Sequence, residues 1–384
     1  MAVFGTRPEA VKMAPVVKAL AERPDRFDVK VAVTAQHREM LDQTLRHFSI
    51  QPDYDLNIMQ QRQTLAGIAT RALEGLDRVM EESRPDLVLV HGDTATTFIG
   101  SLAAFYRRIP VGHVEAGLRT DNKYDPFPEE MNRRLTGQVA DLHFAPTPWA
   151  KSNLLSERVD TKYLFVTGNT AIDALFLTRR ADYRFAEESL LPLDFQSRRV
   201  IVVDTLHRRE NLERMSGIYG AVRRLAEASP EAHLVVLMHK NPAVREAAAP
   251  VLAGLTGITL LDPLDYPDFI NLIDRAHFVI SDSGGVQEEA PSLGSPVLLL
   301  RDTTERPEAL EAGTVRMVGT DPDAIFAAAR RLLTDSAAYR AMQEASNPYG
   351  DGRASQRIAD ALEYYFGWRD APPEPFRPSK PEPS

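Results

Sequence analysis

The sequence predicts an α/β protein with two Rossmann-like domains, each built around a parallel sheet, and three observations support this fold class. The 384 residues are enough for two to three domains at about 150 residues each. Short continuous apolar runs alternate with longer amphipathic stretches, which is typical of parallel strands buried on both faces and joined by helices. Two segments, 85–115 and 276–301, repeat the order strand, loop, helix, strand. Each half of the chain is therefore expected to supply one open parallel sheet.

The expected elements follow from these runs in chain order. A first strand ends at Phe4, before a turn at Gly5, and the later apolar runs are 29–33, 87–90, 111–114, 200–203, 234–237, 278–280 and 297–300. Residues 168–199 are helical in pattern and charged, so we predict an N-terminal domain over 1–168 and a C-terminal domain over 169–368. The last helix is expected to pack back on the first domain. The proline-rich tail 369–384 has little to bury and is predicted to be disordered.

Composition excludes several classes of function. The chain has 54 acidic and 45 basic residues and a net charge of −9, which disfavours a nucleic-acid binder. The absence of cysteine excludes disulfides, thiolate nucleophiles and Cys-type zinc sites. No run of about 18 apolar residues and no signal-peptide pattern is found, so a cytoplasmic protein with no membrane partner is expected.

Two loops have the composition of anion-binding sites. The first places Arg7 and Lys12 after a strand and a glycine turn, at the start of a helix. The second, 282–289, follows a buried strand with Ser283, Gly284 and Gly285, whose backbone N–H groups suit a phosphate, while Glu289 suits the hydroxyls of a ribose. Together they fit a nucleoside diphosphate. The alternatives are an ordinary turn with solvated charges and close helix–strand packing.

Histidine and carboxylate side chains also follow predicted strands. His207 after the strand at 200 is suited to stabilising a leaving phosphate or transferring a proton, and Arg306 adds a cation after the strand at 297. Asp93, Glu115 and Glu129 are candidate proton-transfer groups. Their alternative roles are a helix N-cap for Asp93 and ion pairs with Arg119 or Arg133 for the glutamates. Metalloenzyme spacings are not found, so no metal and no cofactor are expected.

Taken together, these segments resemble the bacterial non-hydrolysing UDP-N-acetylglucosamine 2-epimerases. The matching strings run in order from residue 4 to about residue 352, and they are GTRPE (5–9), TAQHR (34–38), HGDT (91–94), HVEAGLR (113–119), PEE (128–130), GNT (168–170), HRRE (207–210), DSGGVQEEAP (282–291) and TTERP (303–307). The resemblance implies a two-domain glycosyltransferase-B-like fold with the active site in the interdomain cleft, and commonly a homodimer. It also implies interconversion of UDP-N-acetylglucosamine (UDP-GlcNAc) and UDP-N-acetylmannosamine (UDP-ManNAc) for cell-surface polysaccharide precursors.

The resemblance also implies roles for individual residues. Loss of UDP with the C2 proton gives 2-acetamidoglucal, and UDP then adds back with protonation from the opposite face. The implied catalytic residues are Asp93, Glu115, Glu129 and His207, and the implied UDP and sugar contacts are Arg7, Lys12, Arg133, His239, Phe269, Ser283, Gly284, Gly285, Glu289 and Arg306. Phe269 would lie against the uracil. A second UDP-GlcNAc would bind as an activator at Gln36, His37 and Glu39.

Three other functions remain compatible with the same residues. A hydrolysing epimerase shares the first half-reaction but releases UDP and free N-acetylmannosamine. A retaining glycosyltransferase would share the fold but would need an acceptor cleft, and the carboxylate set argues against it. A non-catalytic UDP-sugar sensor would keep Ser283 and Glu289 while losing Asp93, Glu115 or Glu129, and all three of those carboxylates are present.

Overall fold

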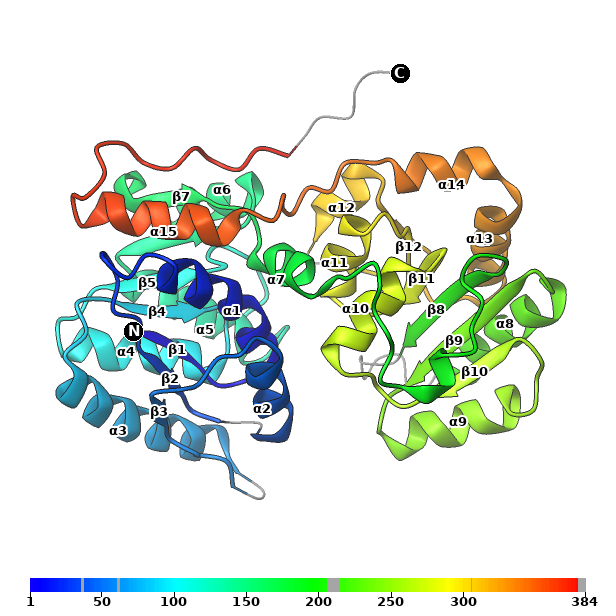
Figure 1. The fold of residues 1–384 in the computed structure, drawn as a ribbon, viewed down its shortest axis with the longest axis horizontal. Helices are drawn as coiled ribbons and strands as arrows, with labels where there is room; N and C mark the ends of the chain where they lie inside the picture. Colours follow the sequence, from blue (N-terminus) through cyan, green and yellow to red (C-terminus); the bar gives the residue numbers. More distant parts are fainter. Residues whose placement is uncertain (36–37, 61–62, 206–213, 305, 379–384) are drawn as a thin grey trace. The chain divides into compact units, whose positions relative to one another are not determined.

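A computed structural model describes residues 1–35, 38–60, 63–205, 214–304 and 306–378. The contacts divide the chain into two compact units (Figure 1). Unit 1 contains Met1–Leu177 together with Tyr349–Arg377, and unit 2 contains Thr178–Pro348. The boundary expected at residue 168 thus falls before a helix, α7 (Thr170–Thr178), whose residues belong to unit 1 up to Leu177.

Unit 1 is built on a parallel sheet of seven strands in the order β3-β2-β1-β4-β5-β6-β7. The strands are β1 (Ala2–Phe4), β2 (Val31–Val33), β3 (Tyr54–Asp55), β4 (Val88–His91), β5 (Val111–Val114), β6 (Leu142–Ala145) and β7 (Leu164–Val166). The helices besides α7 are α1 (Arg7–Ala21), α2 (Arg38–His47), α3 (Leu65–Ser83), α4 (Ala95–Tyr106), α5 (Glu129–Val139), α6 (Pro148–Ser156) and α15 (Ala354–Tyr365). Chain order reverses between β1 and β4, which makes the loops after these two strands the expected ligand-binding edge.

Unit 2 repeats this arrangement with a parallel sheet of six strands in the order β10-β9-β8-β11-β12-β13. The strands are β8 (Arg199–Thr205), β9 (Ala232–Met238), β10 (Ile258–Leu261), β11 (Phe278–Ser281), β12 (Val297–Leu299) and β13 (Val315–Met317). The helices are α8 (Met215–Ala228), α9 (Pro242–Leu252), α10 (Tyr266–Asp274), α11 (Val286–Ser292), α12 (Pro307–Ala312), α13 (Pro322–Thr334) and α14 (Ser336–Gln343). Here chain order reverses between β8 and β11. The predicted fold class, two α/β units with parallel sheets, is confirmed.

The end of the chain completes unit 1. Helix α15 packs against α1, where Ile358 and Leu362 join the same buried cluster as Met13 and Val16. The Asp173 carboxylate on α7 accepts hydrogen bonds from the backbone N–H groups of the first two residues of α15, at 3.1 and 2.7 Å. These contacts fix the start of α15.

The described part of the proline-rich tail ends at Pro378 and contacts unit 1. The backbone N–H of Phe376 donates to the carbonyl oxygen of Val166 at 2.8 Å, and the Phe376 side chain is only 4% exposed. Arg357 of α15 also donates to the carbonyl oxygen of Glu374 at 3.2 Å, so both β7 and α15 contact this proline-rich segment. Residues 379–384 lie outside the described residues. No helix in the described parts of the chain has both the length and the apolarity needed to cross a bilayer.

Candidate active site

The loop after β1 is held in place by a buried glutamate, Glu9. One oxygen of the Glu9 carboxylate accepts the backbone N–H groups of Gly5 and Thr6, at 3.1 and 2.8 Å. The other accepts the hydroxyls of Thr94 and Thr97 at the start of α4, at 2.8 and 3.1 Å. Burial raises the pKa of Glu9, and these hydrogen bonds oppose the rise. Glu9 therefore joins the two loops that flank the point where chain order reverses.

Gly5 is required because the backbone is tightly packed at this point. A Cβ atom on Gly5 would lie 2.0 Å from Thr34 Oγ1 and 2.5 Å from Thr96 Oγ1. The next residue but one, Arg7, begins α1 and is half-buried. Within the described part of the chain, no residue pairs with the Arg7 guanidinium, which is therefore available to an anionic ligand.

Glu115 lies directly after β5, in a left-handed backbone conformation with φ of 61°. Its carboxylate forms an ion pair with Lys12 of α1 and accepts a hydrogen bond from the Asn169 side chain at 3.2 Å. The side chains of Lys12 and Glu115 are 14% and 9% exposed. Two of the predicted site residues therefore meet in a largely buried ion pair, with Asn169 as a partner that the sequence reasoning did not assign.

Two buried histidines on the neighbouring strands β4 and β5 have lowered pKa values. Burial lowers the pKa of His91, the last residue of β4, to about 4, and its Nε2 lies 3.8 Å from Glu115 Oε2. Burial lowers the pKa of His113 on β5 to about 3, and its Nε2 contacts the carbonyl oxygen of Gly92 at 2.7 Å. Both imidazole rings are therefore expected to be neutral at physiological pH.

Asp93 lies after β4 and is held by α5. Arg133 donates to Asp93 Oδ2 at 2.6 Å, and the Asn132 side chain donates to the Asp93 carbonyl oxygen at 2.9 Å. Burial raises the pKa of Asp93, the Arg133 charge opposes the rise, and the Glu115 charge adds to it. The charge of Glu115 therefore acts on the protonation of Asp93, as expected for carboxylates that take part in proton transfer.

The alternative roles for the carboxylates are a helix N-cap for Asp93 and ion pairs with arginines for the two glutamates. Thr94, not Asp93, is the N-cap of α4, because its hydroxyl accepts the Thr97 N–H at 3.2 Å. Arg119 pairs with Glu157 at 2.7 Å. Glu129 is the first residue of α5 and is half-buried, so it begins the same helix that holds Asp93.

Unit 2 places the predicted phosphate loop between β11 and α11. Ser283 N–H donates to the Ser281 hydroxyl at 3.0 Å, and Gly284 and Gly285 follow as the turn into α11. Arg306 does not extend freely from its loop, because it forms a 2.7 Å ion pair with the buried carboxylate of Glu288. Glu288, which the sequence reasoning left without a role, therefore fixes Arg306 close to this loop.

The predicted nucleoside contacts lie on neighbouring elements. The Tyr266 hydroxyl on α10 donates to Glu289 Oε1 at 3.3 Å, and Phe269 lies one turn further along α10, half-buried. His239 follows β9, where it is exposed and its Nδ1 accepts the Asn241 N–H at 3.1 Å. His207, Gln36 and His37 lie outside the described residues. Glu39 belongs to α2, and nothing is described of its side chain.

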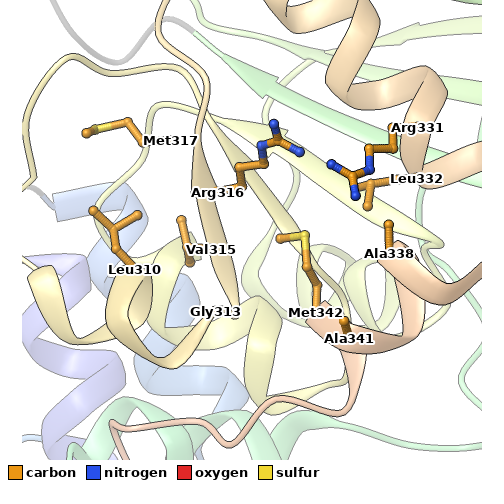
Figure 2. A pocket seen from close by; sticks show the side chains of 10 residues that line it. All are labelled: Leu310, Gly313, Val315, Arg316, Met317, Arg331, Leu332, Ala338, Ala341 and Met342. Atoms are coloured by element: carbon orange, nitrogen blue, oxygen red, sulfur yellow. The ribbon is translucent and has the colours of Figure 1, made fainter. Parts of the chain in front are cut away.

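The described residues contain no group of three His, Asp or Glu side chains arranged to hold a metal ion. A pocket of about 440 Å³ lies away from the predicted residues, between β13, α13 and α14 (Figure 2). Its lining includes Val315, Leu332 and Met342, and no predicted site residue lines it.

Two α/β units with parallel sheets, each with charged side chains in the loops after the strands, place the chain in the class of glycosyltransferase-B-like proteins. A family model described as UDP-N-acetylglucosamine 2-epimerase matches residues 18–363. The chain belongs to this UDP-N-acetylglucosamine 2-epimerase family. It is 55% identical to the UDP-N-acetylglucosamine 2-epimerase of Bacillus subtilis over 377 residues, which cover 98% of each chain.

Solved structures agree with this assignment. The structure of a putative UDP-N-acetylglucosamine 2-epimerase from Listeria monocytogenes matches with a TM-score of 0.91 and 50% identity, covering 98% of both chains. The Neisseria meningitidis UDP-GlcNAc 2-epimerase, solved bound to UDP-GlcNAc, matches with a TM-score of 0.87 and 47% identity, covering 94% of this chain and 99% of that one. The fold and the epimerase class therefore rest on near full-length similarity.

Proposed function

We propose that this epimerase interconverts UDP-GlcNAc and UDP-ManNAc by eliminating UDP and adding it back, without releasing free sugar. A sugar C2–H bond with no adjacent carbonyl is too weakly acidic for direct proton abstraction. Departure of UDP makes C1 oxocarbenium-like and acidifies that proton. The C1–O bond to UDP breaks, a base takes the C2 proton, and 2-acetamidoglucal forms. Re-addition of UDP with protonation of the opposite face of C2 completes the exchange.

The observation that carries this proposal is the pair Asp93 and Glu115, which follow the neighbouring strands β4 and β5 and are each held by a cation. Proton transfer at C2 needs groups that both accept and donate a proton near neutral pH. Burial that raises the pKa of Asp93 moves this carboxyl toward that range. We assign proton transfer to Asp93, Glu115 and Glu129, with His207 as a further catalytic group, and we assign no face of the ring to any one of them.

The nucleotide is assigned to cations and amides suited to a diphosphate. We propose that Arg7, Arg306 and the loop of Ser283, Gly284 and Gly285 stabilise the charge that develops on UDP as it leaves. Glu288 supports this role, because a guanidinium fixed by a buried carboxylate needs no reorganisation when the charge appears. Lys12 contacts Glu115, so its charge serves the proton-transfer carboxylate in addition to its proposed contact with the diphosphate.

The nucleoside and sugar contacts complete the proposal. Glu289, oriented by Tyr266, would hold the ribose hydroxyls, and Phe269 would stack on the uracil. Arg133 and His239 would contact the sugar and the phosphates.

The proposal is tested by incubating the protein with UDP-GlcNAc in deuterated water without added metal or nucleotide cofactor. We expect UDP-ManNAc with deuterium at C2 in NMR spectra, because the C2 proton leaves to a carboxylate that exchanges with solvent. Release of UDP and free N-acetylmannosamine in equal amounts would instead identify the hydrolysing reaction. Turnover with complete retention of protium at C2 would exclude elimination.

We further propose a homodimer in the cytoplasm that supplies UDP-ManNAc for cell-surface polysaccharide precursors, and a second UDP-GlcNAc bound as an activator at Gln36, His37 and Glu39. An activator that favours the active conformation shifts the equilibrium only by its preference for that conformation. The reaction started from UDP-ManNAc alone should therefore show a lag that traces of UDP-GlcNAc abolish. A reverse reaction without a lag, together with hyperbolic forward kinetics, would exclude the activator site.

A further inference from the structure

An unbroken chain of ion pairs runs through unit 1 and ends at Asp93. Glu157 pairs with Arg134 at 3.0 Å, and Arg134 also pairs with Glu130 at 2.8 Å. Glu130 in turn accepts from Arg133 Nη1 at 3.2 Å, and Arg133 Nη2 donates to Asp93 at 2.6 Å. Acidic and basic side chains alternate at every step. The two ends of one guanidinium therefore connect a fully buried glutamate to the candidate proton-transfer group.

We infer that Glu130 is a positioning residue, which fixes the Arg133 guanidinium against Asp93 and thereby controls how readily Asp93 takes up a proton. The inference rests on the proposed role of Asp93 in proton transfer. It assigns to the two adjacent glutamates of α5 different tasks, with Glu129 contacting substrate and Glu130 acting only through Arg133.

The burial and the partners of Glu130 support this division. Its side chain has 0% exposure and accepts three hydrogen bonds, from Arg133, from Arg134 at 2.8 Å and from the Thr120 backbone N–H at 3.1 Å. A carboxylate without access to water needs such compensation, and removing one member of a buried pair leaves the other uncompensated. Because Arg133 and Arg134 lie three and four residues after Glu130, α5 presents both guanidinium groups to the same carboxylate.

The other charges around Asp93 define what the chain of ion pairs controls. Among the described residues, the charged groups with the largest direct effect on Asp93 are Arg133 from α5, Glu115 after β5 and Lys12 from α1, so Glu130 acts on Asp93 through Arg133. Arg133 is the one that contacts it directly. Glu130 and Asp93 share this guanidinium, so the negative charge on Glu130 competes with Asp93 for the same cation.

Two substitutions separate positioning from simple structural support. Glu130→Gln keeps an acceptor oxygen for Arg133 but removes the competing charge, so Asp93 should bind its proton less readily and its pKa should fall by about 0.5 to 1 pH unit, the size expected for one screened unit charge. Arg133→Lys keeps the cation but cannot donate to both carboxylates at once, so the pKa of Asp93 should rise. Opposite shifts from two changes in one contact are not expected of a residue that only supports the fold.

The experiment is an NMR titration of the full chain carrying ¹³C at the aspartate carboxyl carbons, with the Asp93 signal identified by its loss in Asp93→Asn. The pH profile of kcat is measured on the same variants, and its limb for Asp93 should move in the same direction as the NMR titration. Glu129→Gln is the neighbouring control, which should lower kcat without moving the Asp93 titration. Glu81→Gln, at an exposed ion pair with Arg107, should change neither.

An unchanged Asp93 titration in folded Glu130→Gln would overturn the inference. If Glu130→Gln fails to fold, Arg133→Lys decides, and a wild-type titration of Asp93 in that variant would overturn it equally. Failure of the proposed function is distinguishable, because it would appear as wild-type turnover in Asp93→Asn. The NMR titration does not depend on turnover.

Discussion

Replacing Glu9 by alanine should destabilise unit 1 severely, because it leaves buried donors without acceptors. The backbone N–H groups of Gly5 and Thr6 both donate to one Glu9 oxygen, and Glu9 is 2% exposed. Each buried donor left unsatisfied costs roughly 1 to 3 kcal/mol, so the two together cost about 2 to 6 kcal/mol. For a unit of this size, that loss corresponds to a fall in Tm of roughly 5 to 20 °C.

Glu9→Gln is the matched variant. Its amide oxygen can take the position that accepts from Gly5 and Thr6, while its NH2 group faces the hydroxyls of Thr94 and Thr97, which can accept as well as donate. The loss of stability should therefore be much smaller than for alanine. Burial raises the pKa of Glu9 above its ordinary value of 4.5, so the folded protein binds this proton more tightly than the unfolded chain. Its contribution to stability is then complete below pH 4.5 and declines as the pH rises, and glutamine removes that decline.

Urea denaturation of the wild-type protein, Glu9→Ala and Glu9→Gln at pH 5 and pH 8 measures these effects. The difference between Glu9→Gln and wild type should shift in favour of the variant at pH 8. The binding of UDP should weaken in Glu9→Ala, because the loop that carries Arg7 loses its attachment to α4. A loss below about 1 kcal/mol for Glu9→Ala would show that water replaces the carboxylate and would refute the reasoning.

The remaining predictions concern other parts of both units. Gly5→Ala should give little soluble protein, because its Cβ would overlap two buried threonine hydroxyls; normal expression and Tm would contradict this. Asp93→Asn and Glu115→Gln should each lower kcat by roughly 10² to 10⁴ while UDP still binds in calorimetry, and near-normal turnover would identify them as structural. Burial lowers the pKa of His113 from 6.5 to about 3, so the unfolded chain binds this proton more tightly and the free energy of unfolding falls as the pH drops below 6.5. His113→Phe should therefore reduce the pH dependence of the free energy of unfolding between pH 6 and 4 by about 1.4 kcal/mol per pH unit. An unchanged pH dependence would show that His113 takes up its proton in the folded protein. Glu289→Ala should raise the Kd for UDP more than the Kd for inorganic diphosphate, since it is assigned to the ribose; equal changes would exclude that contact.

The elements that sequence reasoning found are those buried on both faces. The run 111–114 coincides with β5, and 278–280 and 297–300 fall within one residue of the ends of β11 and β12. The strands without a predicted run include β3 and β13 at the edges of the sheets, where half-buried or exposed side chains interrupt the apolar pattern, and the interior strand β6, where the buried His143 interrupts it. An edge strand has one neighbour only, so its sequence carries a weaker apolar signal.

The candidate site was predicted where its residues follow strands and was incomplete where their roles depend on packing. The apolar runs 87–90 and 111–114 predict the strands, and Asp93 and Glu115 stand in the loops that come directly after them. Glu9 could have been found from Thr6-x-x-Glu9, which is the pattern of a capping box at a helix start. Glu130 could not, because it differs from Glu129 only by its angle around α5, and the arginines that compensate its burial are recognised only when the helix is in place.

The return of α15 to unit 1 has a consequence for the order in which the protein is completed on the ribosome. Arg23, just after α1, pairs with Asp360 and Glu363 of α15 at 2.8 and 3.1 Å. Helix α1 is translated early, but its partner α15 is translated only after unit 2. In the sequence, unit 2 is a continuous segment between α1 and α15, so it can finish folding before unit 1. Until α15 has been translated, the apolar face of α1 that includes Met13 and Val16 stays uncovered, and such a face is a target for chaperones in a nascent chain.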